Sequence, residues 1–486
     1  MQNVYRSINK LISYAEHRLG LDPRDEHFVR GGILAAIGLS AFEEVDAPPV
    51  TDERPDNVLA EFVSACVENK LFEKADSPRI CDEVMGSLML PPSRLEAQFD
   101  ARAKKDGAMA AMDEFYRYCV AGDYVKKSAL EKNPRFESNG LIVTINKSKP
   151  EFRDAKAAAK QSAAGAYPKC SICHENEGCA DRMKRTLRTV DITLGGQKWF
   201  WQYSPYGYFD RHGIAVNYEH IPMHVDRQTF GRLMDFVDTF PHFFIGSNAA
   251  LPRIGGSVLA HDHYQGGGEV LPLHKAGVRL YVKDAEHPDV KIGILDWRGS
   301  VVRVSGKSRE AVTAVCEKIR AAWVGYEKPE LGIIAEDVDG AHNAISPTVV
   351  KRGDTYDVNI ILRNNVTSKE FPDGVFHAHP EFHSIKKESI GLIEAQGLFI
   401  LPGRLDEQLK RVCSCVEKGK LDKDLEEFAL VFDETRAVFD SGKVKTVEDA
   451  MKEELGSICS RILENTAVFK TDDAFVTFLK EAGFHA

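Results

Sequence analysis

The sequence has no excess of basic residues. Its 486 residues include 63 Lys and Arg against 73 Asp and Glu, which gives a formal net charge of −10. Proteins that bind DNA, RNA or anionic membranes without specificity rely on a basic surface. We therefore expect no nucleic-acid partner and no membrane partner, and any phosphate group that the chain binds must be held by a local site.

Long apolar runs are also missing. The longest one near the N-terminus, residues 33–39, is far shorter than the roughly 20 residues that span a bilayer. Residues 1–20 lack the continuous apolar segment of a signal peptide, and their apolar residues recur at helical spacing. The sequence therefore predicts a soluble, cytoplasmic protein whose N-terminus belongs to the fold.

Cysteine is not used as in small disulfide-stapled proteins. Seven of the ten cysteines are scattered, and only Cys170, Cys173 and Cys179 stand close together. This distribution is typical of reduced thiols with one candidate metal site. The composition, with 43% hydrophobic and 28% charged residues, excludes disorder and indicates a globular chain long enough for about three domains.

Hydrophobic periodicity predicts helical ends and a mixed centre. Within residues 1–324 we expect helices at residues 61–71, 92–103, 109–120, 153–166, 226–240 and 309–324. From residue 406 to the end the chain is expected to be helical again. The expected strands are at residues 140–146, 199–208, 213–218, 258–265, 277–282, 290–295, 301–304 and 356–363.

Histidine is concentrated in one stretch of the chain. Seven of the 16 histidines fall within residues 212–274, where an even spread would place about two. The densest part is a Gly-Gly-Ser-Val-Leu-Ala-His-Asp-His-Tyr-Gln-Gly-Gly motif at residues 255–267. In an extended chain, His261, His263 and Gln265 would share one face, because side chains alternate along a strand.

Such a face suits chemistry at phosphorus. A neutral imidazole is a nucleophile near pH 7, because its reference pKa is about 6.5 and it needs no separate base. Gln265, the Ser257 hydroxyl and the backbone amides of Gly255 and Gly256 could donate to the phosphate oxygens. An isolated His-x-His is more often half of a metal site or part of a packed core, but the flanking glycines favour a phosphate site.

Several segments together resemble galactose-1-phosphate uridylyltransferase, in the second sequence class found in bacteria. They are residues 140–150, 170–178, 202–206, 240–248, 255–267, 376–388 and 391–394. Agreement of several segments in order is far more specific than one short motif. One difference is that the better-known class of the family has His-Pro-His where this chain has His261-Asp262-His263.

The resemblance implies an α/β (α+β) fold, with two histidine-triad-like halves in one chain, each with an antiparallel sheet, framed by helical regions. The corresponding division is a helical region 1–135, a first half 136–300 with the nucleophile, a second half 301–405 and a helical region 406–486. The helical regions serve as framework or as a subunit interface, the latter in a homodimer.

The resemblance also implies a ping-pong reaction. His263 would attack the α-phosphorus of UDP-glucose, release glucose 1-phosphate and form a uridylyl-histidine, and galactose 1-phosphate would then take the uridylyl group. Gln265 would bond the phosphoryl oxygens, and Ser257 and Asn248 would contact the phosphates of the nucleotide sugar. No organic cofactor is expected.

The Cys170-x-x-Cys173 spacing suits zinc, and the resemblance supplies His261 and an upstream histidine as further ligands. Strand register favours His220 over His224 as that histidine. Cys179 could replace a histidine or remain unused, so a structural zinc stays one of two alternatives. His377 and His379 resemble part of a second metal site, although packing explains them equally well, since Pro380 limits a strand there to an edge.

The acceptor site is expected in the second half. The resemblance places a phosphate-binding lysine near Lys386 and Lys387, for which we take Lys387, and a sugar-binding glutamate at Glu394. Without the resemblance, these lysines would be assigned to a solvated charge patch. Arg363 ends an expected strand and could line the same cleft, but a turn explains the polar residues there equally well.

Two other functions remain open at this point. A related nucleotide phosphorylase would keep the nucleophile and use inorganic phosphate as the acceptor. A zinc-dependent nucleotide-binding protein without turnover would use the same cysteine and histidine clusters and form no covalent adduct. The segment-by-segment resemblance favours the transferase.

Overall fold

A computed structural model describes residues 1–147, 167–256 and 258–485. The expected helix at 153–166 and the expected site residue Ser257 lie outside this part of the chain. Among the described residues, no helix combines the length and the apolar character needed to cross a membrane. All ten cysteines are described, and none forms a disulfide.

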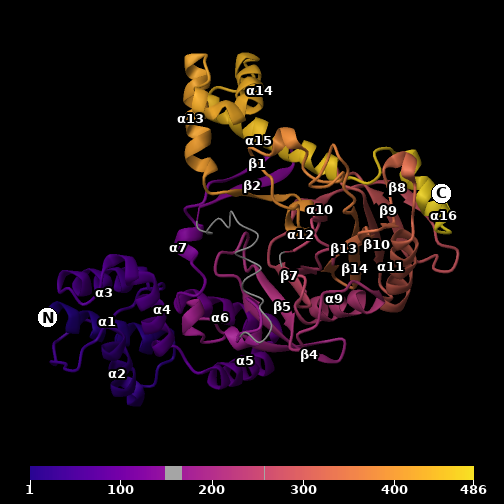
Figure 1. Cartoon of the computed structure of the whole chain (residues 1–486). Helices are drawn as coiled ribbons and strands as arrows, with labels where there is room; N and C mark the ends of the chain where they lie inside the picture. The colour runs from indigo at the N-terminus through magenta and orange to yellow at the C-terminus, as the bar shows by residue number, and fades with distance from the viewer. Residues whose placement is uncertain (148–166, 257, 486) are drawn as a thin grey trace.

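The N-terminal region is helical, as the periodicity predicts. Its helices are α1 (Gln2–Arg18), α2 (Glu26–Ala36), α3 (Asp56–Glu68), α4 (Ser77–Leu88), α5 (Pro92–Asp106), α6 (Ala108–Ala121) and α7 (Lys127–Leu130). The apolar stripe of α1 packs against α2 and α3 in a buried core that α4 also joins, where the hydrophobic effect stabilises the group. Its buried members include Ile8, Leu11, Ile12, Ala15 and Leu19. This group lies to one side of the remaining fold (Figure 1).

The centre of the molecule is one sheet of ten strands, ordered β3-β4-β5-β7-β6-β13-β14-β10-β9-β8. The strands of its first half are β3 (Val190–Leu194), β4 (Gln197–Tyr203), β5 (Gly213–Asn217), β6 (Phe244–Gly246) and β7 (His263–Gly267). Those of its second half are β8 (Val278–Val282), β9 (Lys291–Leu295), β10 (Val301–Gly306), β13 (Asn343–Arg352) and β14 (Thr355–Asn364). The neighbouring strands pair antiparallel.

The two halves of the sheet repeat one topology. Each half has three strands in sequence, then a helix, then two strands, and the last strand of each half lies inside the sheet beside the third. The helices are α9 (Arg227–Thr239) and α11 (Arg309–Val324). The halves meet where β6 pairs with β13, with Ile245 opposite Val349. The expected duplicated α/β fold with antiparallel strands is thereby confirmed.

The helices α9 and α11 pack on the sheet through their apolar stripes. Phe230, Leu233 and Met234 of α9 and Ile319 and Trp323 of α11 join a single buried core with the strands. Burial of such large side chains supplies the main driving force for this layer, at roughly 25 cal/mol per Å² of apolar surface. The two helices therefore cover one face of the sheet.

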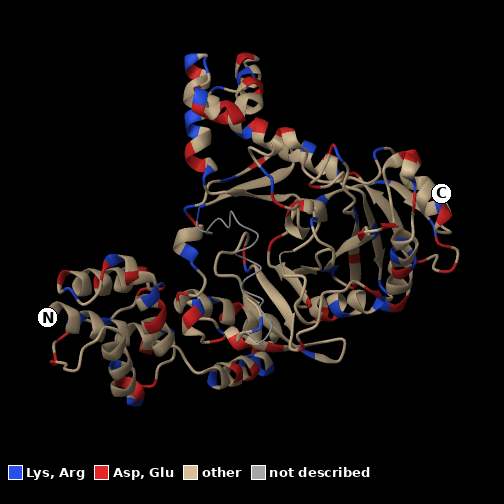
Figure 2. Cartoon of the chain, viewed as in Figure 1, with Lys and Arg blue, Asp and Glu red and all other residues tan. Residues whose placement is uncertain are grey.

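The chain ends in a further helical region. The helices α13 (Leu405–Lys418), α14 (Ala429–Asp440), α15 (Val447–Thr466) and α16 (Asp472–Glu481) follow a small sheet of β1 (Arg135–Ser138), β2 (Leu141–Asn146) and β15 (Leu398–Pro402). In Figure 1, α13 and α14 project from the body. Acidic and basic residues are interspersed along α13 and α14 (Figure 2), as on a solvated surface. The four-part division of the chain stays a prediction.

The expected strand at 258–265 is wrong in its first half, because β7 begins only at His263. The preceding residues form a loop, which the backbone N–H of Asp262 ties to the carbonyl of Ile221 at 2.7 Å. His261 therefore leaves the face that it was expected to share with His263 and Gln265.

The ten-residue strand β13 was missed because Pro347 lies in it, and proline argues against an inner strand. The short helices α10 (Pro272–Lys275) and α12 (Leu392–Ala395) precede β8 and β15, and a hairpin of β11 (Glu336–Asp337) and β12 (Gly340–Ala341) precedes β13.

Candidate functional site

The strand β7 presents alternate side chains to the two faces of the sheet, as expected. Tyr264 points into the core, where its ring stacks on Trp199 with the centroids 4.8 Å apart. His263 and Gln265 occupy the alternate positions and therefore face the opposite side of the sheet. The imidazole and the amide thus share the face that α9 does not cover.

The His263 ring is held in one tautomer. Its Nδ1 lies 2.8 Å from the backbone carbonyl of His261, and a carbonyl oxygen can only accept, so Nδ1–H is the donor. The lone pair of the neutral ring then lies on Nε2. Burial lowers the pKa of His263, of which 6% is exposed, so the ring is neutral at pH 7. A buried, oriented imidazole whose Nε2 carries the lone pair is equipped to act as a nucleophile.

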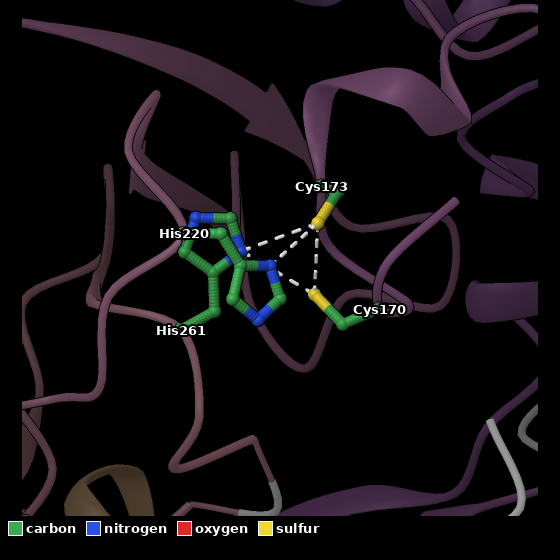
Figure 3. Close-up of side chains that lie close together, drawn as sticks. All are labelled: Cys170, Cys173, His220 and His261. Atoms are coloured by element: carbon green, nitrogen blue, oxygen red, sulfur yellow. Dashed lines mark hydrogen bonds between the residues drawn. The ribbon is translucent and has the colours of Figure 1, made fainter. Parts of the chain in front are cut away.

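Beside His263, two cysteines and two histidines meet in one group, consisting of Cys170, Cys173, His220 and His261 (Figure 3). The Cys173 Sγ lies 3.1 Å from the His220 Nδ1, and the Cys170 Sγ lies 3.3 Å from the His261 Nδ1. All four ligand atoms fall within 4.8 Å of one another. The group could therefore hold a metal ion.

The hydrogen bonds and the protonation states of these side chains are compatible with a bound metal ion. The Nε2–H of His261 donates to the carbonyl of Asn217 at 2.7 Å, which leaves the Nδ1 lone pair facing the two sulfurs. A metal-ligating histidine commonly uses its other nitrogen in this way. Burial lowers the pKa of His261 to about 4, so its ring is neutral, and burial beside Cys170 raises the pKa of Cys173 to about 12. A thiolate at Cys173 would therefore need a cation beside it.

The other metal candidates lie apart from this group. His224 faces Asp226 and Asp262, with its Nδ1 4.0 Å from the Asp262 carboxylate. Cys179 is half-buried in a turn that its backbone closes with Lys184. His377 contacts the carbonyl of Ala378, and His379 contacts the carbonyl of Val375. Among the described residues, neither histidine belongs to a group of three or more possible metal ligands.

The expected phosphate contacts lie at the end of β6. Asn248 is buried, its Oδ1 accepts the backbone N–H of Leu392 at 2.9 Å, and its Nδ2 has no partner among the described residues. A Cβ at Gly256 would lie 2.8 Å from that Nδ2, and a Cβ at Gly255 would collide with the carbonyl of Ala249. The glycines are therefore needed for this close approach, and the Asn248 amide has a donor to spare.

A buried ion pair marks the expected acceptor site. The Lys386 Nζ lies 2.5 Å from the Glu394 Oε1, and both side chains are more than nine-tenths buried. Burial alone would lower the pKa of Lys386, but the carboxylates of Glu394 and Glu388 raise it. Lys387, the lysine chosen from the sequence, is exposed. The fold therefore brings Lys386, not Lys387, to Glu394.

Arg363 lies close to this pair at the end of β14. Its Nη2 donates to the carbonyl of Ile390 at 2.7 Å, and its Nη1 has no partner among the described residues. Burial lowers the pKa of Arg363 to about 10, and Glu394 counteracts this effect. A buried guanidinium with an unused donor is suited to bind an anionic ligand.

Comparison with known proteins decides the family. The model of the galactose-1-phosphate uridyl transferase N-terminal domain matches residues 56–222, and that of the C-terminal domain matches residues 236–425. The chain belongs to the galactose-1-phosphate uridylyltransferase family. It is thus a transferase, and the resemblance seen in its motifs is confirmed.

Curated members of the family match along the whole chain. Galactose-1-phosphate uridylyltransferase from Bifidobacterium longum is 49% identical over 100% of this chain and 99% of that protein. The Fusobacterium nucleatum enzyme is 35% identical over 98% of each chain, and the Bacillus subtilis enzyme is 34% identical over 99% and 98%. Yeast Ap4A phosphorylase Apa2 is similar in structure with a TM-score of 0.33 and 9% identity, over 68% of this chain and 90% of that one.

The sequence analysis assigned no role to Lys386 or His212, which the structure places among the candidate site residues. Lys386 and Lys387 were both candidates and Lys387 was chosen, because the polar stretch at residues 383–389 holds no signal that separates the two. His212 was counted only as one of the clustered histidines, yet its Nε2 lies 3.4 Å from the Gln265 Oε1. No local pattern joins residues 212 and 265, because only the pairing of β5 with β7 brings them together.

Proposed function

We propose that this chain exchanges a uridylyl group between UDP-glucose and galactose 1-phosphate through a uridylyl-histidine at His263. One observation carries the proposal: the His261 carbonyl binds Nδ1–H of His263 and leaves Nε2 as the nucleophilic atom. Family membership supplies the substrates, since the curated relatives are named galactose-1-phosphate uridylyltransferases.

In the first half-reaction, the Nε2 lone pair of His263 attacks the α-phosphorus of UDP-glucose. A P–N bond forms, the bond from the α-phosphorus to the bridging oxygen breaks, and glucose 1-phosphate leaves with that oxygen and its electron pair. Nε2 has no proton to lose, and the positive charge that the ring gains is shared with Nδ1–H on the His261 carbonyl. In the second half-reaction, a phosphate oxygen of galactose 1-phosphate displaces His263 and gives UDP-galactose.

Charge on the phosphoryl oxygens requires donors that are already in place. We assign this role to the amide of Gln265, the unused Nδ2 of Asn248 and the backbone of Gly255 and Gly256. Lys386 and Arg363 would hold the phosphate of the acceptor, and the Glu394 carboxylate would accept from sugar hydroxyls. Ser257 stays a proposal from the sequence alone.

We further propose zinc as the metal at Cys170, Cys173, His220 and His261. Two cysteines and two histidines are a donor set typical of a structural zinc, and all four side chains would be needed to hold it. Bound there, zinc would supply a rigid cross-link and no reactive position. Since His261 would be both ligand and carbonyl acceptor for His263, the site would fix the nucleophile in place. The homodimer and the cytoplasmic location stay predictions.

Replacing Gln265 by alanine should slow both half-reactions by about 10²–10³-fold, because both develop the same charge on the phosphoryl oxygens. Rapid-quench measurements of uridylylation by UDP-glucose and of discharge by galactose 1-phosphate would give the two rates separately. If only one of the two rates fell, Gln265 would not serve the shared phosphoryl group.

Lys386 and its neighbour Lys387 form a matched pair for a test of the acceptor site. Lys386→Met should raise KM for galactose 1-phosphate and lower the free energy of unfolding by about 3–5 kcal/mol, because it leaves Glu394 buried without its partner. Lys387→Met removes an exposed charge and should change stability by less than about 0.5 kcal/mol. Denaturant unfolding and steady-state kinetics measure both effects, and equal effects of the two substitutions would contradict the assignment.

Product analysis tests the proposed function against the phosphorylase alternative. The protein is incubated with UDP-glucose and either galactose 1-phosphate or inorganic phosphate, and the nucleotide products are separated by chromatography. We expect UDP-galactose with the sugar phosphate and no turnover to UDP with inorganic phosphate. Formation of UDP and glucose 1-phosphate from inorganic phosphate at a comparable rate would favour the phosphorylase.

A further inference from the structure

His212 lies beside the amide of Gln265, for which we propose binding to the phosphoryl oxygens. The reaction proposed so far gives His212 no role. It ends the loop between β4 and β5, and 5% of its surface is exposed. Its ring lies against two aromatic rings, with centroids 5.0 Å from Tyr208 and 4.5 Å from Phe209. The antiparallel pairing of Gly213 with Gly266 sets this loop end beside Gln265.

The contacts of His212 define its tautomer. The backbone N–H of Tyr208 points at the His212 Nδ1 across 3.4 Å, so Nδ1 must be the acceptor and Nε2 must carry the proton. The Nε2–H then donates to the Gln265 Oε1 at 3.4 Å. An amide carries its oxygen and its nitrogen on opposite sides, so this bond directs the Nε2H₂ group of Gln265 away from His212.

We propose that His212 is a positioning residue for the transfer reaction, which turns the Gln265 amide so that its NH₂ group meets the phosphoryl oxygens. The inference rests on the proposed function, in which Gln265 donates to those oxygens. A flipped amide would offer its oxygen to the phosphate, where two acceptors would repel each other. In this role His212 acts through Gln265.

The loop is built to hold His212 in this place. The His212 carbonyl accepts the backbone N–H of Ser204 at 2.8 Å, which closes the loop. The Nε of the preceding residue, Arg211, lies 2.9 Å from the Oδ1 of Asp113 in α6. The N-terminal helical region thereby supports the loop that carries His212.

A double-mutant cycle on the full chain tests the inference. His212→Phe keeps a ring between Tyr208 and Phe209 but has no donor, and His212→Gln supplies an amide N–H. The rate of uridylylation by UDP-glucose is measured in a single turnover for wild type, both variants, Gln265→Ala and the double variant His212→Phe/Gln265→Ala. Thermal unfolding checks the fold, and His212→Leu replaces His212→Phe in the cycle if the latter is unfolded.

We expect His212→Phe to slow uridylylation about 10-fold, the value of one hydrogen bond, and His212→Gln to restore the rate to within about 3-fold of wild type. In the Gln265→Ala background, His212→Phe should have no further effect, because the amide that it positions is gone. A full 10-fold effect in that background, or no effect in the wild-type background, would overturn the inference. If wild type formed no adduct at all, the proposed function would fail, and this inference with it.

Discussion

Replacing His263 by alanine should abolish uridylyl transfer, with a loss of at least about 10⁴-fold in the single-turnover rate. The reason is chemical: the covalent intermediate needs the Nε2 lone pair, and the neighbouring Gln265 offers no comparable nucleophile. Binding of UDP should remain nearly intact, because its phosphate donors come from other residues. Quench-flow measurement of uridylylation and calorimetric titration with UDP check the two parts.

A matched control separates this effect from general damage. His287 lies between β8 and β9, where its Nδ1 contacts Asp284 at 2.7 Å, and has no place in the site. His287→Ala should keep the transfer rate within about 2-fold of wild type, as expected of a substitution away from the active site. A His263→Ala variant that kept more than a trace of activity would show that another group carries the uridylyl.

Loss of the metal site should have the second largest effect. Cys173→Ser removes one of four ligands, and we expect it to abolish zinc binding and to lower the free energy of unfolding by more than about 4 kcal/mol. Transfer should fall as well, since His261 would lose its tether and its carbonyl holds His263. Elemental analysis, thermal unfolding and the uridylylation rate measure the three effects.

Cys179→Ser is the control for this prediction, because Cys179 belongs to the same stretch and lies outside the group. It should bind zinc and unfold like wild type. Treatment of wild type with a strong chelator should reproduce the effect of Cys173→Ser. A wild-type protein purified without metal, and as stable as the loaded form, would contradict the metal assignment.

The sequence was most informative where local physics decides the structure. The apolar stripes of α1, α9 and α11 identify their helices, because burial of one face requires that spacing. The alternation of His263, Tyr264 and Gln265 follows from strand geometry, and the Cys-x-x-Cys spacing points to the metal group. These features depend on neighbours along the chain.

What the sequence could not provide are contacts between distant segments. His261 leaves the strand because its ring meets Cys170 and Cys173, some 90 residues earlier. Lys386, and not Lys387, forms an ion pair with the buried Glu394, and the contact of His212 with Gln265 depends on the pairing of β5 with β7. Each depends on tertiary packing, which overrides local patterns.

The central claim is a covalent uridylyl-histidine at His263, and the intact mass of the protein tests it most directly. The protein is incubated with UDP-glucose alone and weighed, then weighed again after addition of galactose 1-phosphate, with His263→Ala alongside. We predict one added uridylyl group on wild type, its removal by the sugar phosphate, and no adduct on the variant. An unchanged mass of wild type, or an equal adduct on His263→Ala, would contradict the account.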